Sequence, residues 1–141
     1  MSNFAIIPSG GVGSRFGSNT PKQYLKCNNK EIIAYTMEVF EKSHEIDEII
    51  IAAQKEFFDL VYEIIKKNIF KKPFRIVEGG STRQDSVFNG LKSINANDDD
   101  LVIVHDAARP LLTQTILMNA IISAKTFDSS VVAIKARDTL L

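Results

Sequence analysis

Short apolar runs alternate along this sequence with longer segments in which apolar residues recur at helical spacing. The apolar runs predict five buried strands, at residues 4–8, 46–53, 74–77, 101–104 and 131–136. The segments between them predict helices at residues 31–43, 55–68 and 84–94, and a fourth helix that is capped by Thr113. Strands that are apolar throughout and alternate with helices are typical of βαβ units. We therefore expect an α/β fold with a doubly wound, mostly parallel sheet and helices on both faces.

Length and charge narrow the class of protein further. The 141 residues fit one hydrophobic core, so we expect residues 1–141 to form a single domain. Lys and Arg number 17, as do Asp and Glu, and this balance argues against binding to nucleic acid or to a membrane surface. The single cysteine, Cys27, excludes an internal disulfide and favours a reducing compartment. Because no signal peptide or membrane-spanning run is visible, a cytoplasmic protein is expected.

Polar or glycine-bearing segments follow the first, third and fourth predicted strands, beginning at Ser9, Gly79 and His105. In open parallel sheets, ligands bind outside the carboxyl ends of the strands. We therefore expect these three segments to converge on one site. The acidic run at residues 97–100 precedes the fourth strand, so it belongs to the opposite end of the sheet and is expected to be a solvated turn.

The first of these segments has the composition of a phosphate-binding loop. Gly10, Gly11 and Gly13 lie within four residues, and glycines let backbone N–H groups approach phosphate oxygens closely. Two cations, Arg15 and Lys22, follow in the same segment. Cations at this place suit a triphosphate whose α-phosphorus is attacked while pyrophosphate leaves, because that chemistry depends on positioning and charge neutralisation.

Two common phosphate loops do not match this segment. A Walker A loop requires G-x-x-x-x-G-K-[ST], and no glycine here has that spacing. The dinucleotide fingerprint requires a third glycine where Phe16 stands, and an acidic residue near the end of the second strand, which is followed by Gln54. A dinucleotide-binding module therefore remains an alternative that two missing residues count against.

Four motifs resemble those of the 2-C-methyl-D-erythritol 4-phosphate cytidylyltransferase family. They are Pro8-x-Gly10-Gly11-x-Gly13-x-Arg15 continued by Pro21-Lys22-Gln23-Tyr24-Leu25, then Glu78-Gly79-Gly80-Ser81-Thr82-Arg83-Gln84-Asp85-Ser86-Val87, His105-Asp106-Ala107-Ala108-Arg109-Pro110 and Ala136-Arg137-Asp138-Thr139. They stand in the family's order over essentially the whole chain. The resemblance implies the Rossmann-like nucleotidyltransferase fold. Members of that family are longer, so it also implies that the C-terminal part of the fold is missing.

The resemblance also implies an activity and a role for individual residues. The activity is transfer of CMP from CTP to 2-C-methyl-D-erythritol 4-phosphate with release of pyrophosphate, in isoprenoid precursor synthesis. Arg15 and Lys22 are the implied catalytic cations, Asp106 the ligand of Mg²⁺, and Arg109 and Thr139 the contacts to the polyol phosphate. The implied nucleotide-binding residues are Pro8, Ser9, Gly10, Gly11, Gly13, Gly80, Ser81, Ser86 and Ala107. The full-length protein is expected to be a homodimer.

Two further hypotheses remain open from the sequence. Ribitol 5-phosphate cytidylyltransferases share the same framework, and Tyr24 and Ala108 favour the methylerythritol branch over them. The chain also departs from the usual family pattern at Ser9-Gly10, where two alanines are usual. The second hypothesis, besides a ribitol 5-phosphate cytidylyltransferase, is that the chain is a non-catalytic nucleotide-binding domain. No chemical role is assigned to His105, for which a structural role is expected, and the role of Arg83 is left undecided.

Overall fold

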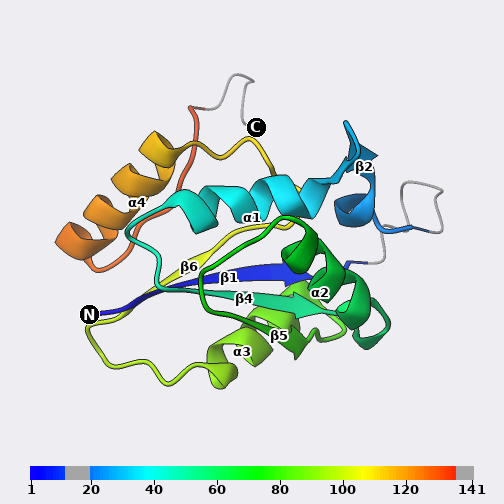
Figure 1. Cartoon of the computed structure of the whole chain (residues 1–141). Helices are drawn as coiled ribbons and strands as arrows, with labels where there is room; N and C mark the ends of the chain where they lie inside the picture. The colour runs from blue at the N-terminus through cyan, green and yellow to red at the C-terminus, as the bar shows by residue number, and fades with distance from the viewer. Residues whose placement is uncertain (12–19, 136–141) are drawn as a thin grey trace, which may run out of the picture.

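The computed structural model describes residues 1–11 and 20–135, and its centre is a four-stranded parallel sheet (Figure 1). The strand order is β5-β4-β1-β6, formed by β1 (Asn3–Ser9), β4 (Glu48–Ala53), β5 (Phe74–Glu78) and β6 (Leu101–Val104). The helices are α1 (Ile32–Lys42), α2 (Phe58–Lys67), α3 (Arg83–Ser93) and α4 (Gln114–Phe127), with short 3₁₀ turns η1 (Lys22–Tyr24) and η2 (Lys55–Phe57). The expected α/β class with a parallel sheet is confirmed.

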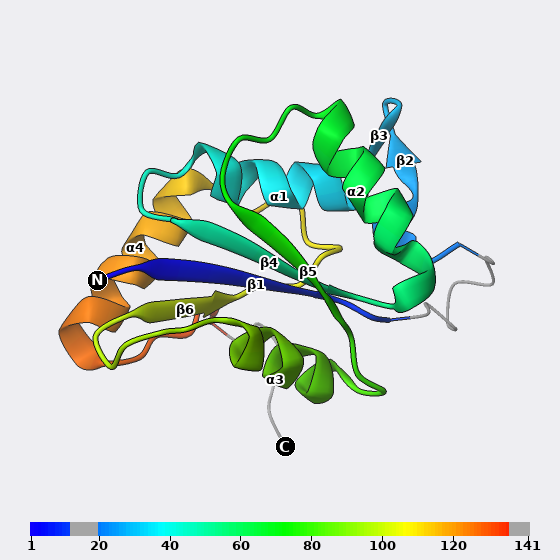
Figure 2. The same cartoon turned by 60° about the horizontal axis from the view of Figure 1, so that its bottom comes forward.

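Helices cover both faces of the sheet, as expected for a doubly wound fold. Figure 2 shows α1 and α2 on one side of the strands and α3 on the other. Alternate residues of β1 face the two layers. Ala5 and Ile7 belong to the large core formed with α1, α2 and α4, whereas Phe4 and Ile6 belong to a smaller core on the opposite face. β1 pairs with β4 and with β6, and all seven of its residues are buried, so the strand that leads into the first loop is held on every side.

One close approach fixes the position of α3 on its face of the sheet. A Cβ at Gly90 would lie 2.8 Å from Cγ2 of Ile6, so only a glycine lets the helix pack this closely onto β1. The face of α3 that packs on the sheet therefore carries small residues. Leu91 is 40% exposed, and Ser86 and Gly90 are the buried residues of α3.

The fifth predicted strand is not formed in the described part of residues 131–136. Residues 131–135 lie outside the sheet, and β6 is its edge. Val131 and Ile134 are almost fully exposed. An apolar, β-branched run has the composition of a buried strand, but a strand forms only where a partner backbone accepts its hydrogen bonds, and none of the described strands pairs with this run. None of the helices in the described ranges is long and apolar enough to cross a membrane.

A small hairpin that the sequence analysis did not predict follows η1. It consists of β2 (Lys26–Cys27) and β3 (Lys30–Glu31), which pair antiparallel. The turn residues Asn28 and Asn29 have φ angles of 50° and 61°. Positive φ at both central residues defines the turn that suits a two-residue hairpin, and asparagine tolerates it better than most residues.

Candidate functional site

The first glycine loop and the segment after β5 are in direct contact at the carboxyl end of the sheet. A Cβ at Gly10 would lie 3.1 Å from Oγ of Ser86 and 3.7 Å from the carbonyl oxygen of Gly80. Gln54, directly after β4, donates from Nε2 to the Gly10 carbonyl at 2.9 Å. The structure therefore brings together two of the three segments that were expected to converge, because both leave the same edge of the sheet.

The turn η1 packs against the beginning of the glycine loop. Gln23 is buried, and its Nε2 donates to the carbonyls of Ser9, at 2.9 Å, and Gly11, at 3.2 Å. The hydroxyls of Ser9 and Tyr24 share a hydrogen bond of 2.9 Å. Burial raises the pKa of the Tyr24 phenol, so this group stays protonated at neutral pH. Lys22 is exposed beside these anchored residues, which fix its backbone next to the loop.

The segment from Gly79 to Ser86 is a compact turn that leads into α3. A Cβ at Gly80 would lie 2.0 Å from Cβ of Asp85, so no side chain fits at that position. The Ser86 hydroxyl accepts from the Gly80 N–H at 3.1 Å and donates to the Thr82 carbonyl at 3.0 Å. Ser86 is therefore buried and engaged within the turn, with one acceptor position left on its oxygen.

A capping box begins α3 in the same turn. The Asp85 N–H donates to Oγ1 of Thr82, and the Thr82 N–H donates to Oδ2 of Asp85, both at 3.1 Å. The Ser81 hydroxyl donates to the same carboxylate oxygen at 2.9 Å. The hydrogen bonds from Thr82 and Ser81 lower the pKa of Asp85. This arrangement leaves the backbone of Gly80 and Ser81 fixed next to Gly10.

The third segment is tied to the second by an ion pair. Nε of Arg83, at the start of α3, lies 2.8 Å from Oδ1 of Asp106, and Nε of Arg109 lies 3.0 Å from Oδ2. Asp106 is thus clamped between two guanidinium groups. Because both arginines are largely exposed, these pairs contribute little stability and can open at small cost.

The backbone around Asp106 is held from inside the protein. Nε2 of His105 lies 2.9 Å from the Arg109 carbonyl, which agrees with the structural role expected for that histidine. Ala107 is buried, and its carbonyl accepts from Oγ1 of Thr36 at 2.8 Å. These contacts fix the backbone on both sides of Asp106, whose carboxylate is partly exposed.

Several predicted site residues differ in how they can reach a ligand. Pro8 and Ser9 are buried in β1, and the Ser9 hydroxyl is already bonded to Tyr24. Gly13, Arg15 and Thr139 lie outside the described residues. No role was predicted for Gln23 or Gln54 from the sequence, although position 54 is where a dinucleotide-binding fold would be expected to carry an acidic residue.

The single carboxylate of Asp106 suits a metal ion whose other ligands come from the phosphates of a substrate and from water. Among the described residues, no group of three or more His, Cys, Asp or Glu side chains could hold a metal ion. Mg²⁺ usually takes one or two carboxylates together with substrate phosphates and water. Asp106 can supply one such oxygen, provided that Arg83 or Arg109 releases it.

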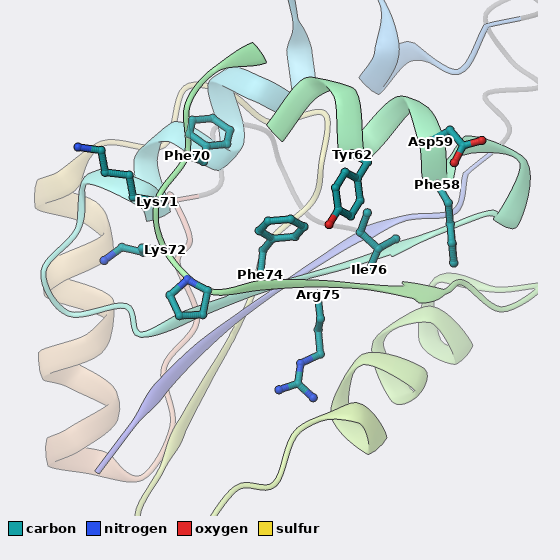
Figure 3. A pocket seen from close by; sticks show the side chains of 10 residues that line it. Phe58, Asp59, Tyr62, Phe70, Lys71, Lys72, Phe74, Arg75 and Ile76 are labelled. Carbon is teal, nitrogen blue, oxygen red and sulfur yellow. The ribbon is translucent and has the colours of Figure 1, made fainter. Parts of the chain in front are cut away.

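A surface hollow of about 650 Å³ lies elsewhere, between α2 and the edge strand β5 (Figure 3). Figure 3 shows Tyr62, Phe74 and Ile76 gathered in it, with Lys71 and Lys72 at one end. None of the predicted site residues lines it. The chemistry of the three converging segments makes their end of the sheet the better candidate, despite the size of this hollow.

Comparisons with known proteins agree with the motifs. A family profile described as "IspD: 2-C-methyl-D-erythritol 4-phosphate cytidylyltransferase" matches residues 3–141. A 2-C-methyl-D-erythritol 4-phosphate cytidylyltransferase of Clostridium botulinum (strain Loch Maree / Type A3) is 39% identical over 138 residues, covering 98% of this chain and 60% of that protein. A protein of the same description from Clostridium acetobutylicum is 41% identical over 139 residues, with the same two coverages.

Solved structures give the same result. The 4-diphosphocytidyl-2C-methyl-D-erythritol synthase of Anaerococcus prevotii superposes with a TM-score of 0.74 at 28% identity, over 88% of this chain and 51% of that one. The bifunctional IspDF of Campylobacter jejuni superposes with a TM-score of 0.69 over 89% of this chain and 31% of that one, but its 22% identity shows the fold alone. The chain spans about 60% of the length of the curated relatives that it matches. Profile, relatives and fold together show that this chain belongs to the IspD, or 2-C-methyl-D-erythritol 4-phosphate cytidylyltransferase, family.

Proposed function

We propose that this chain carries the nucleotide site of an enzyme that transfers CMP from CTP to 2-C-methyl-D-erythritol 4-phosphate and releases pyrophosphate. Membership of the family supports the activity. The observation that carries the proposal is the contact of Gly10 with Gly80 and Ser86, to which Asp106 is linked through Arg83. A glycine loop, a tight turn and a carboxylate are the parts that such a nucleotide site requires.

The proposed reaction needs positioning and charge neutralisation more than proton transfer. A phosphate oxygen of the polyol phosphate forms a bond to the α-phosphorus of CTP, and the bond from that phosphorus to the bridging oxygen breaks. The leaving pyrophosphate takes the electron pair. A phosphate monoester is already anionic at neutral pH, so no general base is needed. Lys22 and Arg15 would offset the charge that develops on the transferring group, and backbone N–H groups of Gly10, Gly11 and Gly13 would hold the phosphates.

The turn after β5 is the proposed base pocket. Gly80, Ser81 and Ser86 would contact the cytosine, and Ala107 would contact the nucleotide from the third segment. Support comes from Gly80, where the absence of a side chain lets the turn close on Asp85 and keeps its backbone fixed beside Gly10. We expect this turn to favour a pyrimidine over a purine, as the resemblance to the family implies.

The metal and the second substrate complete the proposal. Asp106 would hold Mg²⁺ through one carboxylate oxygen, and the ion would supply positive charge to the triphosphate oxygens. Arg109 and Thr139 would contact the polyol phosphate, for which a planar guanidinium is well suited. Arg109 is largely exposed, so its side chain can turn toward a substrate. The whole protein is proposed to act as a homodimer.

A substrate screen tests this function. Pyrophosphate release should be measured for a protein that spans the length of the relatives, with CTP, UTP, ATP and GTP as donors. Each donor is combined with 2-C-methyl-D-erythritol 4-phosphate or with ribitol 5-phosphate. The proposal expects release with CTP and the methylerythritol substrate. Release only with ribitol 5-phosphate would assign the protein to the other polyol, and no release with any pair would contradict an enzymatic role.

A further inference from the structure

Three consecutive carbonyl groups of the glycine loop accept hydrogen bonds from side-chain amides. Gln23 donates to Ser9 and Gly11, and Gln54 donates to the carbonyl between them, that of Gly10. Gln23 comes from η1 and Gln54 from the end of β4, which are separated by 31 residues in sequence. The two glutamines therefore hold the same short stretch of backbone from two different elements.

Holding a carbonyl also fixes the direction of the next N–H group. A trans peptide unit is planar, and its C=O and N–H point in opposite directions. The described residues contain no cis peptide bond. The bond from Gln23 to Ser9 therefore directs the N–H of Gly10 away from Gln23, and the bond from Gln54 to Gly10 directs the N–H of Gly11 away from Gln54.

The hydrogen bonds from the two glutamines restrict a backbone that glycine would otherwise leave flexible. Glycine lets backbone approach a phosphate, but it also loses more conformational freedom on ordering than any other residue. Packing does not order Gly11: it is exposed, and a Cβ there would meet none of the described atoms within 4 Å. The amide bonds restrict the loop before a ligand arrives, so less entropy remains to be lost on binding.

This role at position 54 requires a hydrogen-bond donor, which the Gln54 amide supplies. An ionised carboxylate accepts hydrogen bonds but has no proton to donate, so Asp or Glu would repel the Gly10 carbonyl. We propose that Gln54 and Gln23 are positioning residues that preset the N–H groups of Gly10 and Gly11 for the oxygens of a triphosphate. This inference rests on the proposed nucleotide site and adds two residues to it.

The test compares Gln54→Met with Gln114→Met. Gln54 is only half-buried, so its substitution is expected to leave the fold intact. Gln114, the first residue of α4, is a matched control, because its Nε2 also donates to a main-chain carbonyl, that of Val39 in α1. Calorimetry would measure binding of CTP, tripolyphosphate and cytidine in the presence of Mg²⁺. Amide NMR would follow the Gly10 and Gly11 signals as tripolyphosphate is added.

In Gln54→Met, affinity for CTP and for tripolyphosphate should both fall about tenfold, the scale of one hydrogen bond to a charged group. Affinity for cytidine should not change, and the Gly11 amide should lose the shift that tripolyphosphate causes in the wild type. The control Gln114→Met should behave as the wild type. Gln23→Met, which removes two bonds, should lose more than Gln54→Met if it remains folded.

Each contrary result has a separate meaning. Unchanged tripolyphosphate affinity and an unchanged Gly11 shift in Gln54→Met would overturn the positioning role. An equal loss in Gln114→Met would overturn it as well, because the effect would then be general. Failure of the wild type to bind either CTP or tripolyphosphate would overturn the nucleotide site itself. Equal binding of ATP and CTP with a tenfold loss in the variant would contradict the cytidine specificity and leave the positioning role standing.

Discussion

Substitution of Gly90 by alanine sets two effects of known size against each other. Alanine is the better helix former, by about 1 kcal/mol in a helix interior. The added Cβ, however, would lie 2.8 Å from Cγ2 and 3.3 Å from Cδ1 of Ile6, in a fully buried part of the central strand. Ile6 is β-branched and its χ1 is stiff, so it cannot turn away cheaply. Overpacking of this kind costs about 1–3 kcal/mol, and we expect it to win.

The measurement is thermal unfolding followed by circular dichroism. A net loss of roughly 1 kcal/mol lowers the Tm of a domain of this size by about 4 °C. In an Ile6→Ala background the clashing atoms are absent, so Gly90→Ala should become neutral or stabilising there. A higher Tm for Gly90→Ala in the wild-type background would show that helix propensity dominates and that the close approach of α3 to β1 is misjudged.

Four further outcomes follow from the site. Asp106→Asn should raise the Mg²⁺ concentration needed for CTP binding, and Arg83→Gln should lower that concentration because it frees Oδ1 of Asp106. Equal Mg²⁺ titrations in both variants would show that Asp106 holds no metal. Lys22→Ala should lower turnover on the order of 10²–10³-fold with little change in Tm, and near-normal turnover would remove Lys22 from catalysis. Hydrogen bonds lower the pKa of Asp85, so its ionised carboxylate stabilises the folded protein at pH values above the ordinary Asp pKa. The wild type should therefore have a higher Tm than Asp85→Asn at neutral pH, and this difference in Tm should shrink below about pH 4. A difference that grows in acid would contradict this. Gly80→Ala should abolish CTP binding, because its Cβ would collide with Asp85, and wild-type affinity would show that the turn is not the base pocket.

The sequence allowed the central sheet and its helices to be predicted because their patterns are local. The strand at residues 101–104 is found at Leu101–Val104, and Thr113 caps α4 as expected. The run at residues 131–136 is also mostly apolar, but strand formation depends on a partner backbone that composition does not reveal. The turn at Asn28-Asn29 does carry a local signal for a hairpin, because both residues tolerate positive φ.

The candidate site could be predicted only at the level of segments. Topology placed the first two loops at one edge of the sheet, and the contact at Gly10 confirms it. The bonds that organise the site join distant residues: Gln54 reaches Gly10 across 44 positions, and Arg83 reaches Asp106 across 23. Periodicity and spacing carry no information about such pairs. The ion pair of Arg83 could be found only once α3 was placed against the segment after β6.

The central claim is that the three converging segments bind CTP. Calorimetric titration of the wild-type chain with CTP and with ATP, each with Mg²⁺, tests it most directly. The fixed turn at Gly80 and the proposed pyrimidine-sized pocket predict that CTP binds and that ATP binds much more weakly. Equal affinity for the two nucleotides, or binding of neither, would contradict the account.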